Sequence, residues 1–429
     1  MCGITGFVST RSLSEEDLYV YIDKMSSVLN HRGPDDTGAW VDKEKNISLG
    51  HKRLSILDLS AFGHQPMTSS SNRYIIVFNG EELQLVEGLE VRQPEAGEVK
   101  VKIVNAGVCH SDVSVIDGTI PFPTPVVLGH EGAGIVTEVG DAVNSVSVGD
   151  HVVLSTLGQC GACPACDAGQ PTMCKATFGA RDTPFSLDGE PHYNFANISA
   201  FSENVVVKAN QAIRIPEDVP LDAASLIGCG VLTGSGAVFN RAKVKPGESV
   251  AVVGVGGIGL NVIQAAAIAG ANPIIAIDTN SEKGDLAIDF GATDFINATD
   301  VNTNQEIRKI RADGVCYVFE CVGSKALIEE SIGYLDWGGT LVILGVPPLG
   351  STIEFMTVAT YLDVTIMGCR YGTSRPQADV TRICELYKAG KFKLDELVSR
   401  VYPMEEIHTL LDDMYEGRLA RGVLDVGSI

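Results

Sequence analysis

The feature that most constrains the fold is a glycine-rich segment, GVGGIG, at residues 254–259. It follows the strand-like stretch SVAVV and precedes the helical stretch LNVIQAAAIAG, and a second apolar stretch, PIIAID, ends at Asp278. Glycines in this G-x-G-x-x-G spacing allow a tight turn, a close approach of pyrophosphate to the helix N-terminus and close packing of helix on strand. The order strand, turn, helix, strand predicts a βαβ unit of a doubly wound parallel sheet that binds a dinucleotide.

Asp278 favours one dinucleotide over the other. It stands about twenty residues after the turn, where a carboxylate accepts a hydrogen bond from the adenosine ribose 2′-OH. The same charge repels a 2′-phosphate, so NAD is expected rather than NADP. The competing interpretation is that Asp278 caps a helix formed by SEKGDLAIDFG.

Four of the eleven cysteines lie in QCGACPACDAGQPTMC, at positions 160, 163, 166 and 174. Four thiolates on one short loop can complete a tetrahedral shell around zinc and leave no position for a substrate. The sequence therefore predicts a structural zinc site. An iron–sulfur cluster is the main alternative, and four unrelated thiols are the weaker one.

A second set of metal-binding residue types is dispersed: Cys109 in GVCHSD, His130 and Glu131 in LGHEGAG, and Cys229 in LIGCGVLTG. Two thiolates and an imidazole leave one position on zinc open, as a catalytic site requires. Glu131 would lie behind the metal or ligate it rarely. Taken singly, a cysteine or histidine on an apolar strand is more often an ordinary core residue, and Glu131 alone could be a plain surface charge.

Two patterns divide the rest of the chain. Short valine-rich runs between residues 83 and 207 predict a β-rich region, and apolar strands alternate with helical stretches from Lys245.

The chain has 429 residues and a net charge of -22, which repels nucleic acid. Residues 1–81 carry only -2 of this charge, which suggests parts of different origin. No signal peptide or membrane span is expected, so a cytoplasmic protein without a membrane partner is predicted.

Together these motifs, in this order, resemble the zinc-dependent medium-chain alcohol dehydrogenases from about residue 83 onward. The resemblance implies a GroES-like β-rich catalytic domain at 82–230, a Rossmann NAD-binding domain at 231–370, and a return to the catalytic domain at 371–429. It implies NAD and two zinc ions per chain. Cys109, His130 and Cys229 would hold the catalytic ion, and the four-cysteine loop the structural one.

The same resemblance implies further roles. Ser111 would start a proton path, although Ser114 stands where the family often has the histidine that ends it. The implied cofactor contacts are His110, Thr233, Gly254, Gly256, Gly257, Ile258, Gly259, Asp278, Lys283, Val322, Val346 and Arg421.

The first 81 residues follow a different pattern. MCGITGF, NHRGPDDTG, GHKRLSILDLS, GHQPM and FNGE resemble glutamine-hydrolysing asparagine synthetase, an N-terminal-nucleophile amidotransferase. By that likeness Cys2 would be the nucleophile, Arg53 would hold the glutamine carboxylate, and Asn79 with Gly80 would form the oxyanion hole. Because the pattern stops at Glu81, too early for a layered core, we expect an incomplete segment without glutaminase activity.

At the junction of the two patterns, we expect residues 74–78 to supply the first strand of the dehydrogenase.

The function expected for the whole chain is reversible hydride transfer from a zinc-bound primary or aryl alcohol to NAD. One alternative substrate is an S-(hydroxymethyl)thiol, the thiol adduct of formaldehyde. Another alternative is a non-productive fusion that binds zinc and NAD without turnover. A homo-oligomer is expected, with an edge strand within residues 357–372.

Overall fold

The computed structural model describes residues 3–9, 11, 13–29, 36–53, 67–68, 75–76, 83–178, 181–348 and 350–427. The chain forms two compact units. One comprises Met1–Val86 with His110–Thr124, and the other comprises Glu87–Cys109 with Pro125–Ile429. Both predicted groups of metal ligands and the glycine turn belong to the second unit.

The first unit contains a three-stranded antiparallel sheet in the order β1 (Gly3–Val8), β3 (Ile47–Arg53), β2 (Asp36–Asp42). Helix α1 (Glu15–Ser27) packs on it and buries Leu18 and Ile22. Gly50 makes this packing close, because a Cβ there would lie 2.9 Å from Ile22 Cγ1. Helix α2 (His110–Ile116) belongs to the same unit.

Of residues 74–78, where a first strand of the dehydrogenase is expected, the structure describes only Ile75–Ile76. In the described residues Ile75–Ile76 (β5) pairs antiparallel with Met67–Thr68 (β4) as a separate two-stranded sheet, and not with a strand of the dehydrogenase. The other residues of this stretch lie outside the described residues, so the expectation that it supplies the strand stays a prediction.

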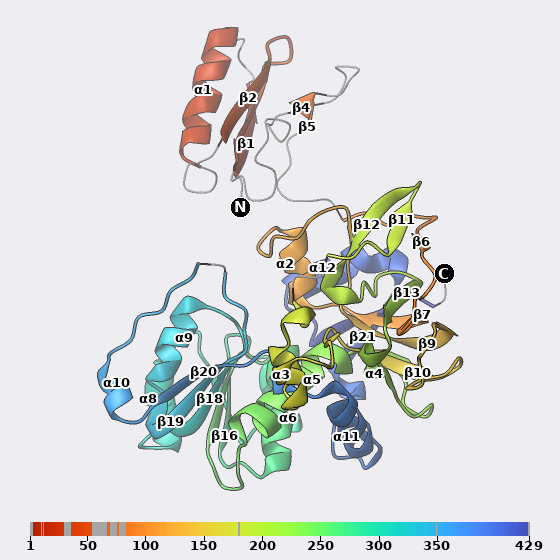
Figure 1. Cartoon of the computed structure of the whole chain (residues 1–429). Helices are drawn as coiled ribbons and strands as arrows, with labels where there is room; N and C mark the ends of the chain where they lie inside the picture. The colour runs from red at the N-terminus through yellow and green to blue at the C-terminus, as the bar shows by residue number, and fades with distance from the viewer. Residues whose placement is uncertain are drawn as a thin grey trace. The chain divides into compact units, whose positions relative to one another are not determined.

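The Rossmann prediction is confirmed. Six parallel strands form one sheet in the order β17 (Asp294–Asn297), β16 (Ile274–Asp278), β15 (Val250–Val253), β18 (Val315–Glu320), β19 (Leu335–Ile343), β20 (Thr365–Gly368). In sequence order this is 3-2-1-4-5-6, the arrangement of dinucleotide-binding folds. The connecting helices are α6 (Gly257–Ala269), α7 (Lys283–Asp289), α8 (Thr303–Ile310), α9 (Lys325–Ile332) and α10 (Val358–Tyr361) (Figure 1).

Both faces of this sheet are buried. Alternate residues of β15, such as Val250 and Val252, join one apolar cluster with α6, while Ala251 and Val253 join a second cluster with α8 and α9. Side chains alternate across a strand, so strands that are apolar throughout need cover on both sides. This explains the unbroken apolar runs in the sequence.

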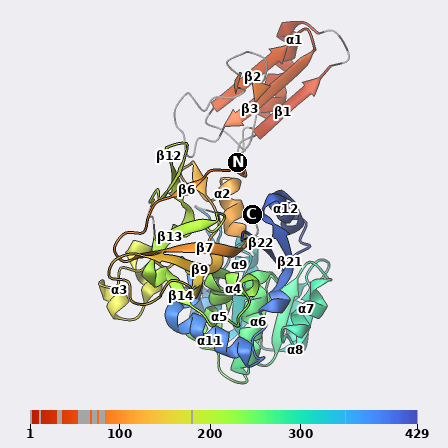
Figure 2. The ribbon, with the colours of Figure 1, turned by 90° about the vertical axis from the view of Figure 1, so that its right-hand side faces the viewer.

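The β-rich part is built on a seven-stranded sheet. Its order is β14 (Ala212–Arg214), β10 (His151–Leu154), β9 (Glu131–Val139), β7 (Glu98–Gly107), β22 (Arg421–Asp425), β21 (Val398–Pro403), and β13 (Asn204–Lys208) also pairs with β7. Figure 2 shows β22 beside β7 although they are far apart in sequence. A smaller sheet has the order β6 (Glu90–Val91), β11 (Phe185–Leu187), β12 (Glu190–Asn194), β8 (Val126–Val127).

Short helices complete the second unit: α3 (Pro164–Asp167), α4 (Leu221–Ser225), α5 (Leu232–Gly236), α11 (Pro376–Lys388) and α12 (Ile407–Tyr415). Helices α5 and α6 pack together between the parallel sheet and the β-rich part (Figure 1). Among the described helices, none has the length and apolar character needed to cross a bilayer.

Candidate active site

The dispersed metal ligands come together. One ligand atom from each of Cys109, His130, Glu131 and Cys229 lies within 4.8 Å of the others. Strands β7 and β9 bring the first three into register, since Gly107 pairs with Glu131, and Cys109 and His130 adjoin these paired ends. Cys229 comes from a π-helical turn, Ile227–Val231, that precedes α5. Two thiols and an imidazole are the soft donor set that zinc prefers.

This group is buried, and its thiols influence each other. Cys229 donates a hydrogen bond to Cys109, which lowers the pKa of Cys109 despite burial. The same bond, with burial, raises the pKa of Cys229. The ring of Phe195 meets His130 edge-on, with the ring centroids 5.7 Å apart. A cation among these groups would favour both thiolates.

Glu131 is fully buried and has two partners. Its Oε1 accepts from the backbone N–H of Gly230 at 3.1 Å, and its Oε2 forms an ion pair with Arg421 Nη2. Burial works against the charge of Arg421, but the carboxylate of Glu131 and the sulfur of Cys109 raise its pKa. Arg421 also contacts the glycine turn, because a Cβ on Gly257 would lie 2.3 Å from its Cδ. One arginine therefore touches both the metal group and the dinucleotide turn.

The four-cysteine loop forms a second metal-binding group, in which the sulfurs of Cys160, Cys163, Cys166 and Cys174 lie within 4.8 Å of one another. The backbone N–H of Cys160 donates to Cys174 Sγ at 3.5 Å and lowers the pKa of Cys174 to about 6. Burial raises the pKa of Cys166 to about 11. The loop thus favours the thiolate form of Cys174, and a bound metal would favour ionisation of the other three thiols as well.

The glycine turn has the geometry expected of it. Gly254 has φ +92°, and Gly256 precedes α6 with open space around it. A Cβ on Gly259 would lie 1.9 Å from the carbonyl oxygen of Gly254. The turn therefore needs Gly254 for its conformation and Gly259 for packing, while Gly256 leaves the helix N-terminus accessible.

Asp278 ends β16 and accepts hydrogen bonds from the backbone N–H groups of Val255 at 2.8 Å and Asn280 at 2.9 Å. Lys283 Nζ lies 3.1 Å from its carboxylate. Helix α7 is preceded by Glu282, so the alternative in which Asp278 caps that helix is wrong.

The other expected contacts are distributed as follows. Thr233 is buried in α5, while Val322 and Val346 are exposed beyond the carboxyl ends of β18 and β19. A Cβ on Gly254 would touch Val322, so this valine borders the turn. Ile258 lies in the first turn of α6 and packs on the core.

The remaining predicted residues lie in or beside the first unit. Ser111 and His110 begin α2. Cys2, Asn79 and Gly80 lie outside the described residues, and so does the side chain of Arg53 at the end of β3. The structure therefore adds nothing to the amidotransferase assignments.

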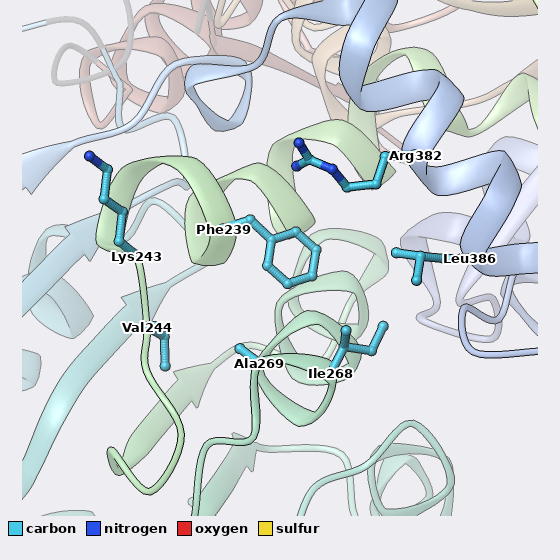
Figure 3. Close-up of a pocket in the computed structure, with 7 residues that line it drawn as sticks. All are labelled: Phe239, Lys243, Val244, Ile268, Ala269, Arg382 and Leu386. Atoms are coloured by element: carbon cyan, nitrogen blue, oxygen red, sulfur yellow. The ribbon is translucent and has the colours of Figure 1, made fainter.

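The structure also has a cavity of about 570 Å³ with a different set of residues around it (Figure 3). It is lined by Phe239, Lys243, Val244, Ile268, Ala269, Arg382 and Leu386. Arg382 is already ion-paired with Asp379 at 3.3 Å. No predicted ligand lines this cavity, so the candidate active site is the metal group and not this cavity.

Three family models match the chain. They are the alcohol dehydrogenase GroES-like domain over residues 95–217, the zinc-binding dehydrogenase over residues 257–388, and the glutamine amidotransferase domain over residues 1–90. Fold, metal groups and models together define a zinc-binding dehydrogenase preceded by an amidotransferase segment. The chain belongs to the zinc-dependent alcohol dehydrogenases, as its motifs predicted.

Individual relatives agree. The chain is 39% identical over 358 residues to an S-(hydroxymethyl)glutathione dehydrogenase of Synechocystis, covering 80% of this chain and 96% of the relative. It is 35% identical to the solved benzyl alcohol dehydrogenase of Acinetobacter calcoaceticus, with a TM-score of 0.75 and coverage of 79% and 94%. A zinc-binding dehydrogenase of Sinorhizobium meliloti, solved with NADP bound, is 26% identical with a TM-score of 0.65 and coverage of 78% and 94%.

Proposed function

We propose that the chain oxidises a primary or aryl alcohol to the aldehyde with NAD as hydride acceptor, and catalyses the reverse reaction. The carrying observation is that Arg421 contacts both Glu131, within the metal group, and Gly257, in the dinucleotide turn. Substrate and cofactor would then meet at one place. The likeness to a benzyl alcohol dehydrogenase supports an aryl alcohol.

In this proposal Cys109, His130 and Cys229 hold a catalytic zinc ion, and the four-cysteine loop holds a structural one. Bound zinc makes an alcohol more acidic, and NAD accepts its hydride. Buried Glu131 and Arg421 balance each other's charge behind the metal group. Ser111, two positions after Cys109, accepts the alcohol proton and starts its path to solvent.

The cofactor contacts follow the carboxyl edge of the parallel sheet. Gly254, Gly256 and Gly259 receive the pyrophosphate, and Asp278 with Lys283 binds the adenosine ribose. The further contacts in this assignment are His110, Thr233, Gly257, Ile258, Val322, Val346 and Arg421. Asp278 favours NAD, although the relative from Sinorhizobium meliloti carries NADP.

A second candidate substrate is an S-(hydroxymethyl)thiol, favoured by the likeness to the Synechocystis enzyme. The test is the near-ultraviolet absorbance of NADH after the full chain is mixed with NAD and either benzyl alcohol or formaldehyde with glutathione. Oxidation of benzyl alcohol supports the first substrate, and a strict thiol requirement supports the second. Binding of zinc and NAD without turnover of either would identify a non-productive fusion and contradict the proposal.

We further propose that the chain assembles with copies of itself through the β20 edge of the parallel sheet. Large apolar side chains around this edge are exposed: Trp337 (78%), Met356 (78%) and Tyr361 (85%). Such a patch on a soluble chain is typical of an interface. Light scattering tests this, since Tyr361→Glu should lower the measured mass of the assembly, and an unchanged mass would contradict it.

The domain limits also remain proposals: 1–81, 82–230, 231–370 and 371–429. The entry of β21 and β22 into the β-rich sheet supports the last of them. The ten described cysteines are all free thiols, which supports a reducing, cytoplasmic location.

A further inference from the structure

The cavity at the C-terminal end of α6 takes no part in the function proposed above. Its volume, about 570 Å³, is within the range of small-molecule sites, roughly 300–1,000 Å³. The apolar side chains of its wall are Phe239, Val244, Ile268 and Leu386. The ring of Phe239 points toward Ile268 and Leu386 (Figure 3), and Ile268 is 36% exposed. The wall therefore offers an open apolar surface to a ligand with a hydrocarbon part.

The two charged side chains that line the cavity, Lys243 and Arg382, are both cations. Acidic residues outnumber basic ones by 54 to 32 in this chain, so a lining with cations alone departs from its overall charge. Arg382 extends from α11 toward the side of the cavity formed by Phe239, whereas the ammonium group of Lys243 points away from the apolar wall (Figure 3). Arg382 is thus the nearer charge, and Lys243 adds a positive charge at the rim.

Arg382 has donors to spare. Its Nη1 lies 3.3 Å from Asp379 Oδ1, and in the described part of the chain this is its one ion pair. The carboxylate of Asp379 also accepts hydrogen bonds from the backbone N–H of Arg375 at 2.7 Å and from Asn240 Nδ2 at 3.0 Å. A guanidinium has five N–H groups, so Arg382 can bind a second carboxylate without giving up Asp379.

Lys243 occupies a position at which its backbone conformation favours glycine. It ends the π-helical turn Ala237–Ala242 with φ 56° and ψ 47°, in the left-handed region. Glycine is the usual residue at such a helix end because it has no Cβ. A side chain retained in a disfavoured conformation points to a function for that side chain.

The cavity also lies at the ends of two elements that lead to the active site. One is the helical run Ile227–Ala242, which carries Cys229 in its first turn and Phe239 in its last. The other is α6, which begins at Gly257 in the glycine turn and carries Ile268 near its end. An occupant of the cavity would therefore contact both elements without reaching the metal group.

We propose that this cavity binds a small amphipathic carboxylate. Its hydrocarbon part packs on the apolar wall, its carboxylate binds Arg382, and Lys243 adds attraction at the rim. A carboxylate fits the guanidinium because two oxygens can accept two parallel N–H bonds. A neutral or cationic amphiphile would gain the apolar contact and not the charge interaction.

The test is calorimetric titration of the full zinc-loaded chain with octanoate. We expect one saturable site per chain. Octylamine, with the same hydrocarbon chain and the opposite charge, should bind at least about tenfold more weakly, and so should propionate, which lacks most of the hydrocarbon. Absence of saturable octanoate binding, or equal binding of octylamine, would overturn the inference.

Substitutions locate the site. Arg382→Gln should weaken octanoate binding about fivefold or more. Arg400→Gln is the matched control and should keep the affinity, because Arg400 is 54% exposed and ion-paired at 3.3 Å, against 46% and 3.3 Å for Arg382. Unchanged affinity in Arg382→Gln would contradict the proposal.

Lys243→Gly separates loss of the charge from general damage. Glycine suits the left-handed backbone, so the unfolding temperature should stay the same or rise while octanoate binding weakens about twofold or more. Cys109→Ser should bind octanoate as the unsubstituted chain does. Binding that disappears in Cys109→Ser would place the carboxylate at the metal group and overturn the assignment to this cavity.

Discussion

At the scale of single residues, the group proposed to hold the catalytic zinc depends on donors that come from separate parts of the chain. Cys109 and His130 adjoin paired strands, and Cys229 lies on a turn about a hundred residues later. Each donor is near its neighbours only because the strands around it are in register. Loss of one donor therefore removes a ligand and leaves the scaffold in place.

We expect Cys109→Ser to reduce the bound zinc from two ions to one per chain, because the four-cysteine loop is untouched. Alcohol oxidation should fall by at least about 1000-fold, since a metal supplies several kcal/mol of stabilisation to the developing charge. Metal analysis and steady-state rates measure both. Cys316→Ser, outside either group, is the matched control, and equal zinc in both variants would refute the assignment.

Asp278 should set the choice of cofactor. Asp278→Asn keeps an acceptor for the Val255 N–H but removes the charge, so the ratio of kcat/KM for NAD to that for NADP should fall about 10- to 100-fold. The expected sign follows from repulsion between carboxylate and 2′-phosphate. Rates with the two cofactors measure it, and an unchanged ratio would show that Asp278 does not face the ribose.

Some residue contacts were beyond sequence reasoning. Glu131 and Arg421 lie 290 positions apart, and no local pattern connects them. Arg370 and Thr177 lie 193 positions apart, and no local pattern predicted their hydrogen bond either. The metal ligands could be identified because their chemistry restricts both residue type and spacing.

At the scale of elements, the glycine turn at residues 254–259 has one glycine that the packing of the fold requires and another that leaves space for a ligand. Gly259→Ala would place a methyl group 1.9 Å from the Gly254 carbonyl oxygen, which forces the helix off the strand. We expect about 3 kcal/mol of destabilisation, and a melting temperature lower by roughly 3–4 °C. Thermal unfolding followed by circular dichroism measures it.

Gly256→Ala is the matched counterpart. No atom lies within 4 Å of a Cβ at this position, so the unfolding temperature should stay unchanged. The methyl group would occupy the space in front of α6 where the pyrophosphate binds, and NAD affinity measured by calorimetry should fall at least about tenfold. Full NAD affinity in this variant would place the pyrophosphate elsewhere.

Helices and strands could be predicted where the residues that determine them lie close together in the sequence. The βαβ order followed from strand and helix patterns around GVGGIG, and the six-stranded sheet confirms it. The pairing of β22 with β7 did not follow, because it joins residues more than 300 positions apart. The pairing of Ile75–Ile76 with β4 did not follow from the sequence either, because neither short stretch carries a pattern that selects its partner.

At the scale of the whole molecule, the chain joins two segments that match different protein families. The amidotransferase model ends at residue 90, and the described part of that segment amounts to a few short strands and one helix around a small core. A layered hydrolase core needs more chain than this. We therefore expect the segment to add no second active centre to the dehydrogenase.

We expect the full chain to release no ammonia from glutamine. A coupled ammonia assay measures this, with Cys2→Ala as the control variant. Ammonia release that the substitution abolishes would show that the shortened segment is still an enzyme. Alcohol oxidation should be the same in the two proteins, because each described metal group has its four donors within residues 109–229.

The position of Arg421 has a consequence for how the chain is made. During translation, Glu131 is synthesised 290 residues before Arg421, whose guanidinium balances the charge of its carboxylate. Until then the nascent protein holds a carboxylate that its own fold would bury without a counter-charge. We therefore expect the catalytic sheet to close only after β22, which carries Arg421, has been synthesised.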